Sequence, residues 1–322
     1  MSTAGLDEHV TATAAEVDAG TADTRPALAW LGRQGVLGAE LPAAVALVRE
    51  VSAASLATGF SLWSQTMVLE YLRCCPTPVG NPLRDVLRTG EVTGATALAS
   101  AIADLAGGDP VPVHAVPDTD GDGAGWRLTG RIPWASNLFD GGVLVTPARS
   151  DDGTRIVAVL RLPEGAVQLE GPLLALNGTG TGAVQLDDVP VPADAVLSTD
   201  LAGFVGLCLP AILLTQTAMA VGVADAALSS AGSPDPELEG RSRDVADRLT
   251  ALAAAPDHGD RPTFAQLRLD AMALAADAVR LEGTTRLGSG FRAGSPTSRR
   301  IREVAFLPVQ APTVAQLRAQ AG

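Results

Sequence analysis

GWRLTGRIPWASN, residues 125–137, is the stretch on which the prediction of the fold rests. Its side chains alternate between apolar and polar after a glycine-rich turn, which is typical of a β-strand with one exposed face. Two similar stretches follow, GGVLVTPAR and RIVAVLRL, with SDDG as the turn between them. The sequence therefore predicts a compact β-domain over residues 93–198.

The segments on both sides of this β-domain have a helical pattern. Apolar residues recur at spacings of three and four between Pro26 and Leu72, and again in PAILLTQTAMAVGVADAAL, RSRDVADRLTALAAA and FAQLRLDAMALAADAVRLEGTTRL. We expect an N-terminal helical domain over residues 1–92 and a C-terminal helical bundle over residues 199–322. Because runs of helices flank a run of strands, the predicted fold class is α+β with segregated layers.

The charge of the chain excludes several functions. Its 23 basic residues are all arginines and stand against 36 acidic residues, which gives a net charge of −13. An acidic surface repels nucleic acids and anionic lipid headgroups, so we expect neither a nucleic acid nor a membrane as a partner. Because the sequence contains no lysine, Schiff-base chemistry and a lysine general base are excluded.

The cysteines, the hydropathy and the histidines indicate the environment of the chain. Three cysteines cannot form a disulfide framework, and the N-terminus lacks the pattern of a secretory signal, so we expect a cytoplasmic protein. The most apolar stretch, Phe204 to Val223, contains a proline and several polar residues and is expected to be a buried core helix. The three histidines lie singly in unrelated segments, so we assign no metal site.

Three segments, in this order along the chain, resemble acyl-CoA dehydrogenases. They are GWRLTGRIPWASN in the β-domain, VQLDDVPVPADAVL before a long helix, and SRRIREVAFLPVQAPTVAQLR near the end of the chain. The resemblance covers nearly the whole chain. It implies a central β-barrel-like domain between two helical domains, a flavoprotein oxidoreductase, and FAD as the cofactor.

The resemblance also implies which residues hold the flavin. Trp134 would pack against the isoalloxazine ring, and the hydroxyl or amide of Ser136 would reach the N5 edge of the ring as a hydrogen-bond donor. The further residues implied to contact the cofactor are Leu98, Ser100, Gly288, Gly290 and Thr313.

The chain departs from the family at the residue that takes a proton from the substrate. Ala311 stands where acyl-CoA dehydrogenases commonly have the glutamate that abstracts the α-proton, and Pro312 follows it. Some relatives place this base on the first long helix of the C-terminal domain, where this chain has the apolar stretch Pro210–Thr215. Alanine and aliphatic side chains cannot take a proton. Glu70, on an N-terminal helix, is the one replacement base that we nominate.

Three functions remain open at this point. The first is an acyl-CoA dehydrogenase-like flavoprotein oxidoreductase that acts on an acyl thioester or a related small molecule with a non-standard or absent base. The second is a flavin-dependent monooxygenase of the same fold, which needs no carboxylate base. The third is a non-catalytic partner subunit of a heteromeric acyl-CoA dehydrogenase, because the Arg-x-x-Phe-Gly segment that grips the cofactor diphosphate in that family has no counterpart. The apolar C-terminal helices predict a homo-oligomer or a hetero-oligomer with a homologous subunit.

Overall fold

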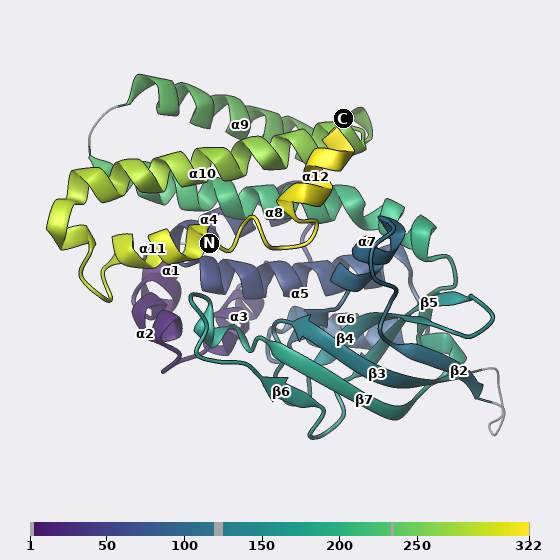
Figure 1. Cartoon of the computed structure of the whole chain (residues 1–322). Helices are drawn as coiled ribbons and strands as arrows, with labels where there is room; N and C mark the ends of the chain where they lie inside the picture. The colour runs from purple at the N-terminus through teal and green to yellow at the C-terminus, as the bar shows by residue number, and fades with distance from the viewer. Residues whose placement is uncertain (1–2, 119–124, 233–234, 322) are drawn as a thin grey trace.

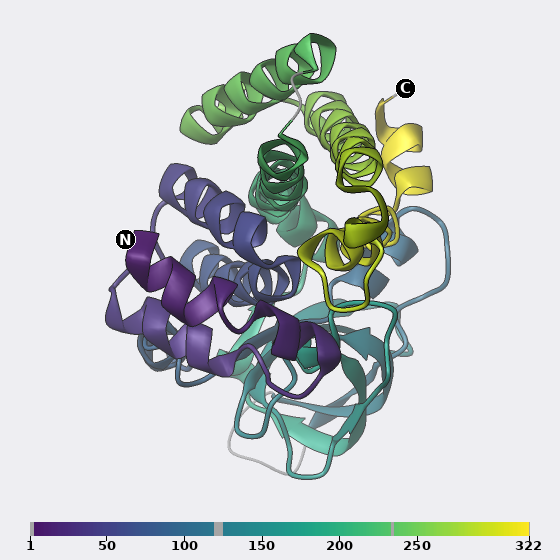
Figure 2. The ribbon, with the colours of Figure 1, turned by 90° about the vertical axis from the view of Figure 1, so that its left-hand side faces the viewer.

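The computed structural model describes residues 3–118, 125–232 and 235–321. Helices from both ends of the chain pack together on one side of a mixed β-sheet, and α9 and α10 lie farthest from that sheet (Figure 1). In the view turned by 90°, the N-terminal helices lie beside the C-terminal bundle and above the strands (Figure 2). The α+β organisation expected from the sequence is therefore confirmed.

The N-terminal region is helical. Its elements are α1 (Thr3–Leu6), a π-helical turn (Asp7–Thr11), α2 (Ala14–Ala19), α3 (Arg25–Arg33), α4 (Leu41–Ala54), α5 (Leu56–Cys74) and α6 (Gly80–Arg88). Almost every residue of α5 is buried, and the helix begins at Ser55, whose hydroxyl oxygen accepts a hydrogen bond from the backbone N–H of Thr58. Helix α5 is thus the centre of this region and the element on which the sheet packs.

The strands run from Gly94 to Ser198. They are β1 (Gly94–Thr96), β2 (His114–Asp118), β3 (Gly125–Ala135), β4 (Val143–Arg149), β5 (Arg155–Arg161), β6 (Val167–Leu169), β7 (Gly182–Val191) and β8 (Val196–Ser198). The pairing order is β6-β7-β3-β2-β4-β5-β8, and β1 pairs in parallel with β4. Among the described strands β6 and β8 remain as two ends, so the barrel-like domain is an open sheet.

One helix interrupts the region that was expected to contain only strands and turns. Helix α7 (Ala99–Leu105) follows β1 directly, because the alanine-rich sequence ALASAIADLA favours a helix over a strand. Ala101 and Ile102 are its buried side chains. Leu98 precedes the first turn of α7 and is held at the junction between sheet and helices.

The C-terminal region is a helical bundle. Its helices are α8 (Leu201–Ala231), α9 (Pro236–Ala254), α10 (Arg261–Gly290), α11 (Pro296–Val304) and α12 (Val314–Ala321). Helices α8, α9 and α10 each begin after an aspartate whose carboxylate accepts a backbone N–H, namely Asp200, Asp235 and Asp260. Pro236 stands at the first position of α9, directly after the cap Asp235, where proline is favoured.

Helix α8 is the core of this bundle. Of the described helices, it alone is long and apolar enough to cross a membrane, but 83% of its most apolar window is buried inside the protein. Helices α4, α5 and α10 pack around it. The prediction of a buried core helix is confirmed.

Candidate active site

A cavity of about 710 Å³ lies where both helical regions meet the sheet. Its wall is formed by α5, the end of β3, the loop between β6 and β7, α8, and the segment that follows α11. Most of the lining side chains are apolar, and the aromatic ones are Phe60, Trp63, Tyr71, Trp134 and Phe306. Aromatic residues make up only 3% of the chain, so their concentration here indicates a site for a flat ligand.

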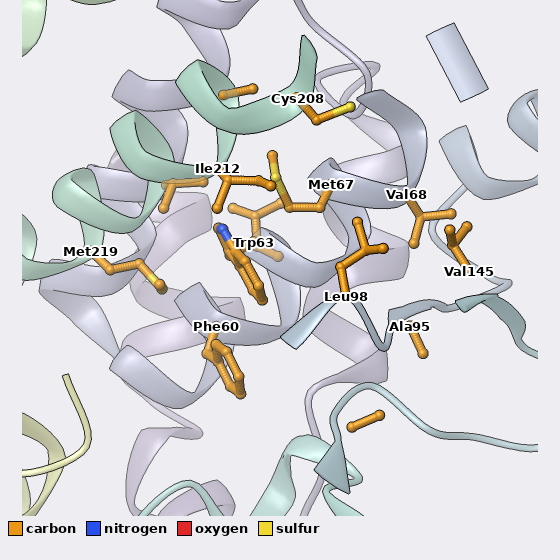
Figure 3. Close-up of a cluster of buried hydrophobic side chains, with 14 of the residues drawn as sticks. Phe60, Trp63, Met67, Val68, Ala95, Leu98, Val145, Cys208, Ile212 and Met219 are labelled. Atoms are coloured by element: carbon orange, nitrogen blue, oxygen red, sulfur yellow. The ribbon is translucent and has the colours of Figure 1, made fainter. Parts of the chain in front are cut away.

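Helix α5 supplies the innermost aromatic side chains. Phe60 and Trp63 stack with their ring centroids 5.5 Å apart, and Phe306 meets Phe60 edge-on at 4.7 Å. In Figure 3 the indole of Trp63 lies between α5 and α8, with its nitrogen end toward Ile212. This indole N–H is buried and has no hydrogen-bond partner among the described residues. An unpaired buried donor costs about 1–3 kcal/mol, which an acceptor atom of a bound molecule would recover.

The rim of the cavity exposes apolar surface. Trp134 at the end of β3 is 56% exposed, Leu174 in the loop before β7 is 70% exposed, and Val309 after α11 is 65% exposed. All three line the cavity. Large apolar side chains gathered around a hollow are typical of a surface that a ligand covers.

A buried polar junction holds the end of β3 against α5. The side-chain amide of Gln65 donates to the carbonyls of Leu87 and Val92, and its oxygen accepts from the N–H of Gly94 at 2.6 Å. Asn137 donates to the carbonyl of Gly94 at 3.0 Å and has a positive φ of 66°, which asparagine tolerates better than most residues. This junction places Trp134 and Ser136, which immediately precede it, at the cavity wall.

Three hydroxyl groups lie in a row at and behind this wall. Ser136 Oγ is 2.7 Å from Thr181 Oγ1, which is 2.7 Å from Thr179 Oγ1. Thr179 Oγ1 donates to the carbonyl oxygen of Leu176 at 2.7 Å. Ser136 and Thr181 line the cavity, and Thr179 is fully buried behind them. This row is the polar part of a mainly apolar wall.

Among the described residues that line the cavity, one is charged. Arg302 binds the carboxylate of Asp18 through both terminal nitrogens, at 2.8 and 2.5 Å, and donates to the carbonyl of Leu174 at 3.1 Å. The hydrogen bond with Asp18 raises the pKa of Arg302 above its ordinary value. Within the described parts of the chain, no aspartate, glutamate or histidine lines the cavity. Ala311 and Ile212, from the two segments that carry the base in the family, both belong to its wall.

The segment that carries Ala311 is held from behind by two buried side chains. Gln216 of α8 donates to the carbonyl of Ala311 at 2.9 Å. Arg268 of α10 donates to the carbonyls of Pro312 at 2.7 Å and Gln310 at 3.1 Å. Burial lowers the pKa of Arg268 to about 9, which still leaves the guanidinium charged at neutral pH. The cavity wall at Ala311 is therefore fixed by buried hydrogen bonds.

The structure brings only some of the predicted site residues together. Leu98, Trp134 and Ser136 line the cavity, whereas Ser100 and Thr313 do not. Ser100 is turned back onto the carbonyl of Ala97, and the N–H of Thr313 donates to Gln316. Their contact with a cofactor remains a prediction.

Three other predicted residues lie at separate places. Glu70 forms an ion pair with Arg73 at 2.7 Å and lies outside the cavity lining, although its neighbour Tyr71 belongs to that lining. Gly290 is buried at the end of α10, and Gly288 lines a shallow surface hollow of about 770 Å³. The structure therefore offers no geometry for Glu70 as a base in this cavity.

Two site residues escaped the sequence analysis. Thr181 contacts Ser136 across 45 positions of sequence, so no local pattern connects them. Arg302 was part of the recognised C-terminal segment, but its partner Asp18 lies 284 positions away. Only the assembled fold brings these pairs together.

No family model matches the chain, and no curated protein matches it in sequence. Solved structures are similar to it over almost its whole length. Butyryl-CoA dehydrogenase from Megasphaera elsdenii superposes with a TM-score of 0.86 at 16% identity, covering 99% of this chain and 94% of that chain. Glutaryl-CoA dehydrogenase from Mycobacterium smegmatis in complex with FADH2 gives 0.79 at 16% identity, covering 100% and 94%. Nitrososynthase from Micromonospora carbonacea var. africana gives 0.73 at 21% identity, covering 98% and 93%. The chain has the fold of the acyl-CoA dehydrogenases, as the resemblance implied.

Proposed function

We propose that this chain is a flavin-dependent monooxygenase that uses a reduced flavin and dioxygen to oxidise a small, mainly apolar molecule in the cytoplasm. The observation that carries the proposal is the composition of the cavity wall. Ala311 and Ile212 cannot take a proton, and the described lining residues include no aspartate, glutamate or histidine. Abstraction of an α-proton needs such a base, whereas oxygen insertion by a reduced flavin does not.

The cavity suits the ring of a flavin. Its volume of about 710 Å³ lies within the range of sites for small molecules and cofactors. Trp134 presents a half-exposed indole, and aromatic rings stack on flat heterocycles. Ser136 and Thr181 supply polar atoms beside this indole, as polar ring edges require. We therefore propose that FAD places its ring here, with the substrate against α5 and α8.

The dinucleotide part of FAD has fewer partners on this chain. Arg302 is the one cation in the described cavity lining, and it is already paired with Asp18. The glycine segment Gly288–Gly290 lies beside Leu287 and Phe291, which are both 72% exposed. Exposed apolar surface of this kind is typical of an interface. We propose that a second copy of the chain covers this hollow and that the pair completes the dinucleotide site.

The protein groups have defined tasks in this chemistry. A bound reduced flavin supplies two electrons and two protons, which with dioxygen put one oxygen atom into the substrate and release the other as water. Phe60, Trp63 and Phe306 keep water away from the reacting atoms and shape the substrate pocket. Arg302 ties the rim loop to α2 through Leu174 and Asp18, which keeps that side of the cavity closed.

A second candidate is a dehydrogenase of acyl thioesters. The similarity to butyryl-CoA dehydrogenase, with a TM-score of 0.86, exceeds the similarity to nitrososynthase, with 0.73, and favours this alternative. A dehydrogenase would need a base from outside the described cavity lining. The fold alone does not determine the reaction, so we place the wall composition above the overall similarity.

Three measurements on the purified protein separate these functions: flavin absorbance, uptake of dioxygen and analysis of the product. The purified protein is loaded with FAD, reduced under anaerobic conditions, and mixed with dioxygen and a panel of small amines, alcohols and thioesters. Substrate-dependent uptake of dioxygen with an oxidised product supports the monooxygenase. Bleaching of the oxidised flavin by acyl-CoA esters alone would contradict it and support the dehydrogenase. A protein that binds no flavin in either oxidation state would contradict both and favour a partner subunit.

A further inference from the structure

The last hydrogen bond of the row, from Thr179 to a carbonyl oxygen, determines which hydroxyl group donates in the other two. A carbonyl oxygen only accepts, so the 2.7 Å contact between Thr179 Oγ1 and Leu176 O uses the single hydroxyl proton of Thr179. Thr179 therefore has no proton left for Thr181, and the 2.7 Å contact between them requires Thr181 to donate. By the same reasoning Ser136 donates to Thr181 at 2.7 Å.

Because of this direction, no hydroxyl proton of the row points toward the cavity. Ser136 and Thr181 both line the cavity, and both donate their hydroxyl protons away from it, toward the fully buried Thr179. Ser64, which also lines the cavity, commits its proton in the same way to the carbonyl of Gly94 at 2.9 Å. The hydroxyl groups of Ser64, Ser136 and Thr181 can therefore accept hydrogen bonds from a bound molecule but do not donate to it.

We propose that Thr181 and Thr179 are positioning residues that hold Ser136 as a hydrogen-bond acceptor toward the cavity, so that the site prefers an occupant with an N–H donor at this place. The inference rests on the proposed flavin and deepens it. An oxidised isoalloxazine presents a lone pair at N5, whereas the reduced ring presents an N–H there. An acceptor oxygen repels the first and bonds the second. The row therefore favours the reduced flavin that the proposed monooxygenase uses. It makes the Ser136 hydroxyl an acceptor, whereas the resemblance implied a donor from the hydroxyl or the amide.

The test compares the affinities of oxidised and reduced flavin. Dissociation constants are measured anaerobically for both states, together with the midpoint potential of the bound flavin, in the wild type, Thr181→Val and Thr179→Val. Either change releases the inward proton of the row, so that Ser136 can donate to the oxidised ring. We expect the preference for reduced flavin to fall about threefold to tenfold, the effect of one hydrogen bond. For a two-electron couple, this change lowers the potential by about 15–30 mV.

Two control variants show whether a changed potential comes from the direction of these hydrogen bonds or from altered packing. Thr181→Ser keeps the hydroxyl and is expected to keep the wild-type potential. Thr217→Val removes another buried threonine hydroxyl, which bonds the carbonyl of Leu213 at 2.7 Å in α8 outside the cavity lining, and is expected to leave the potential unchanged. These controls also show whether an altered potential follows from a general loss of stability.

The outcomes are distinct. A potential that stays constant in both Thr181→Val and Thr179→Val, or that rises, overturns the inference while leaving flavin binding intact. An equal shift in Thr217→Val overturns it as well, because the effect would not belong to the row. Failure of the wild type to bind flavin in either state overturns the proposed function and this inference with it. A fall in both valine variants, with Thr181→Ser unchanged, supports the assigned direction.

Discussion

The side-chain amide of Gln216 donates a hydrogen bond of 2.9 Å to the carbonyl oxygen of Ala311. Helix α8 thereby fixes the backbone at the position where acyl-CoA dehydrogenases commonly carry their base. Arg268 holds the two flanking carbonyls, those of Gln310 and Pro312. The backbone of this segment is therefore held in place by hydrogen bonds. Ala311 differs from the base of the family in its side chain, while the backbone around it is ordered.

Restoring the carboxylate at this wall is the first prediction. Ala311→Glu is expected to allow bleaching of oxidised flavin by acyl-CoA esters, because a positioned base is worth about 10²–10⁴-fold in proton transfer. The wild type is expected to bleach more slowly by a factor in that range. Stopped-flow absorbance of the bound flavin measures both rates, with Ala311→Gln as the isosteric control without a charge. Rapid bleaching by the wild type would show that another residue already supplies the base.

The second prediction concerns Arg268. This residue is buried, and its guanidinium donates hydrogen bonds to backbone carbonyls and forms no ion pair with a carboxylate among the described residues. Arg268→Met leaves these carbonyls without their donor, so we expect the free energy of unfolding to fall by about 2–5 kcal/mol. Denaturant unfolding followed by circular dichroism measures this loss. Arg280→Met, which removes an exposed arginine paired with Asp277, is the control and is expected to cost less than about 1 kcal/mol. Equal losses in both variants would contradict the role of Arg268.

The third prediction concerns the half-exposed indole of Trp134. Trp134→Ala is expected to weaken flavin binding about threefold to tenfold, because one aromatic stacking contact is worth roughly 0.5–1.5 kcal/mol. Its effect on stability is expected to be small, since more than half of the side chain already contacts solvent. Titration of flavin fluorescence measures the affinity, and Leu169→Ala on β6, another exposed apolar side chain outside the cavity, is the control. Unchanged affinity in Trp134→Ala would remove this residue from the flavin site.

The local motif explains which site residues were predictable. Trp134 and Ser136 lie in a contiguous segment that resembles a known family, and both line the cavity. Leu98 lines it as well, although it lies outside the three segments that carry the resemblance. Thr181 comes beside Ser136 because Ala135 on β3 pairs with Gly182 on β7, a register that depends on the folded sheet. Sequence periodicity predicts that strands exist, but it does not predict which positions of two strands are neighbours.

The same limit applies to helices. The alternating pattern from Thr93 onward predicted strands and did not predict α7. The segment that forms α7 is short and alanine-rich, so it shows little apolar periodicity. Glu70 was nominated because it is a carboxylate on the right helix. One residue along an α-helix rotates the side chain by about 100°, so Tyr71 lines the cavity while Glu70 bonds Arg73.

The fourth prediction concerns the hollow beside the end of α10. Leu287 and Phe291 are strongly exposed there, so a second copy of the chain is expected to cover them. Phe291→Arg is expected to shift the protein from dimers or larger assemblies to monomers at micromolar concentration. Light scattering after gel filtration measures the mass. Leu169→Arg, at an exposed apolar position on β6, is expected to leave the assembly intact. A monomeric wild type would contradict this interface.

The fifth prediction concerns pH and the buried pair that joins α10 to α11. Glu282 is fully buried, accepts from Arg300 Nε at 2.8 Å, and accepts from the hydroxyl of Thr297 at 2.7 Å. Burial pushes the pKa of Glu282 upward, but the hydrogen bonds from Arg300 and Thr297 outweigh burial and hold the pKa below its ordinary value. The unfolded chain therefore takes up this proton at a higher pH than the folded chain does. The stability that the pair contributes is complete above the unfolded pKa of about 4.3 and is lost as the pH falls through the lower folded pKa.

Glu282→Gln tests this sign. At pH 7 the variant leaves the charge of Arg300 without its partner, so we expect a loss of about 3–5 kcal/mol in the free energy of unfolding. As the pH falls from 5 toward 3, the wild type loses its own contribution from the pair, and the difference between the two proteins is expected to shrink. Urea unfolding at a series of pH values measures this difference, and Glu164→Gln, at an exposed position, is expected to differ from the wild type by less than about 0.5 kcal/mol throughout. A difference that stays constant from pH 7 to pH 3 would show that the pKa of Glu282 is the same in the folded and unfolded chain, and that its contribution comes from packing and hydrogen bonding without the charge.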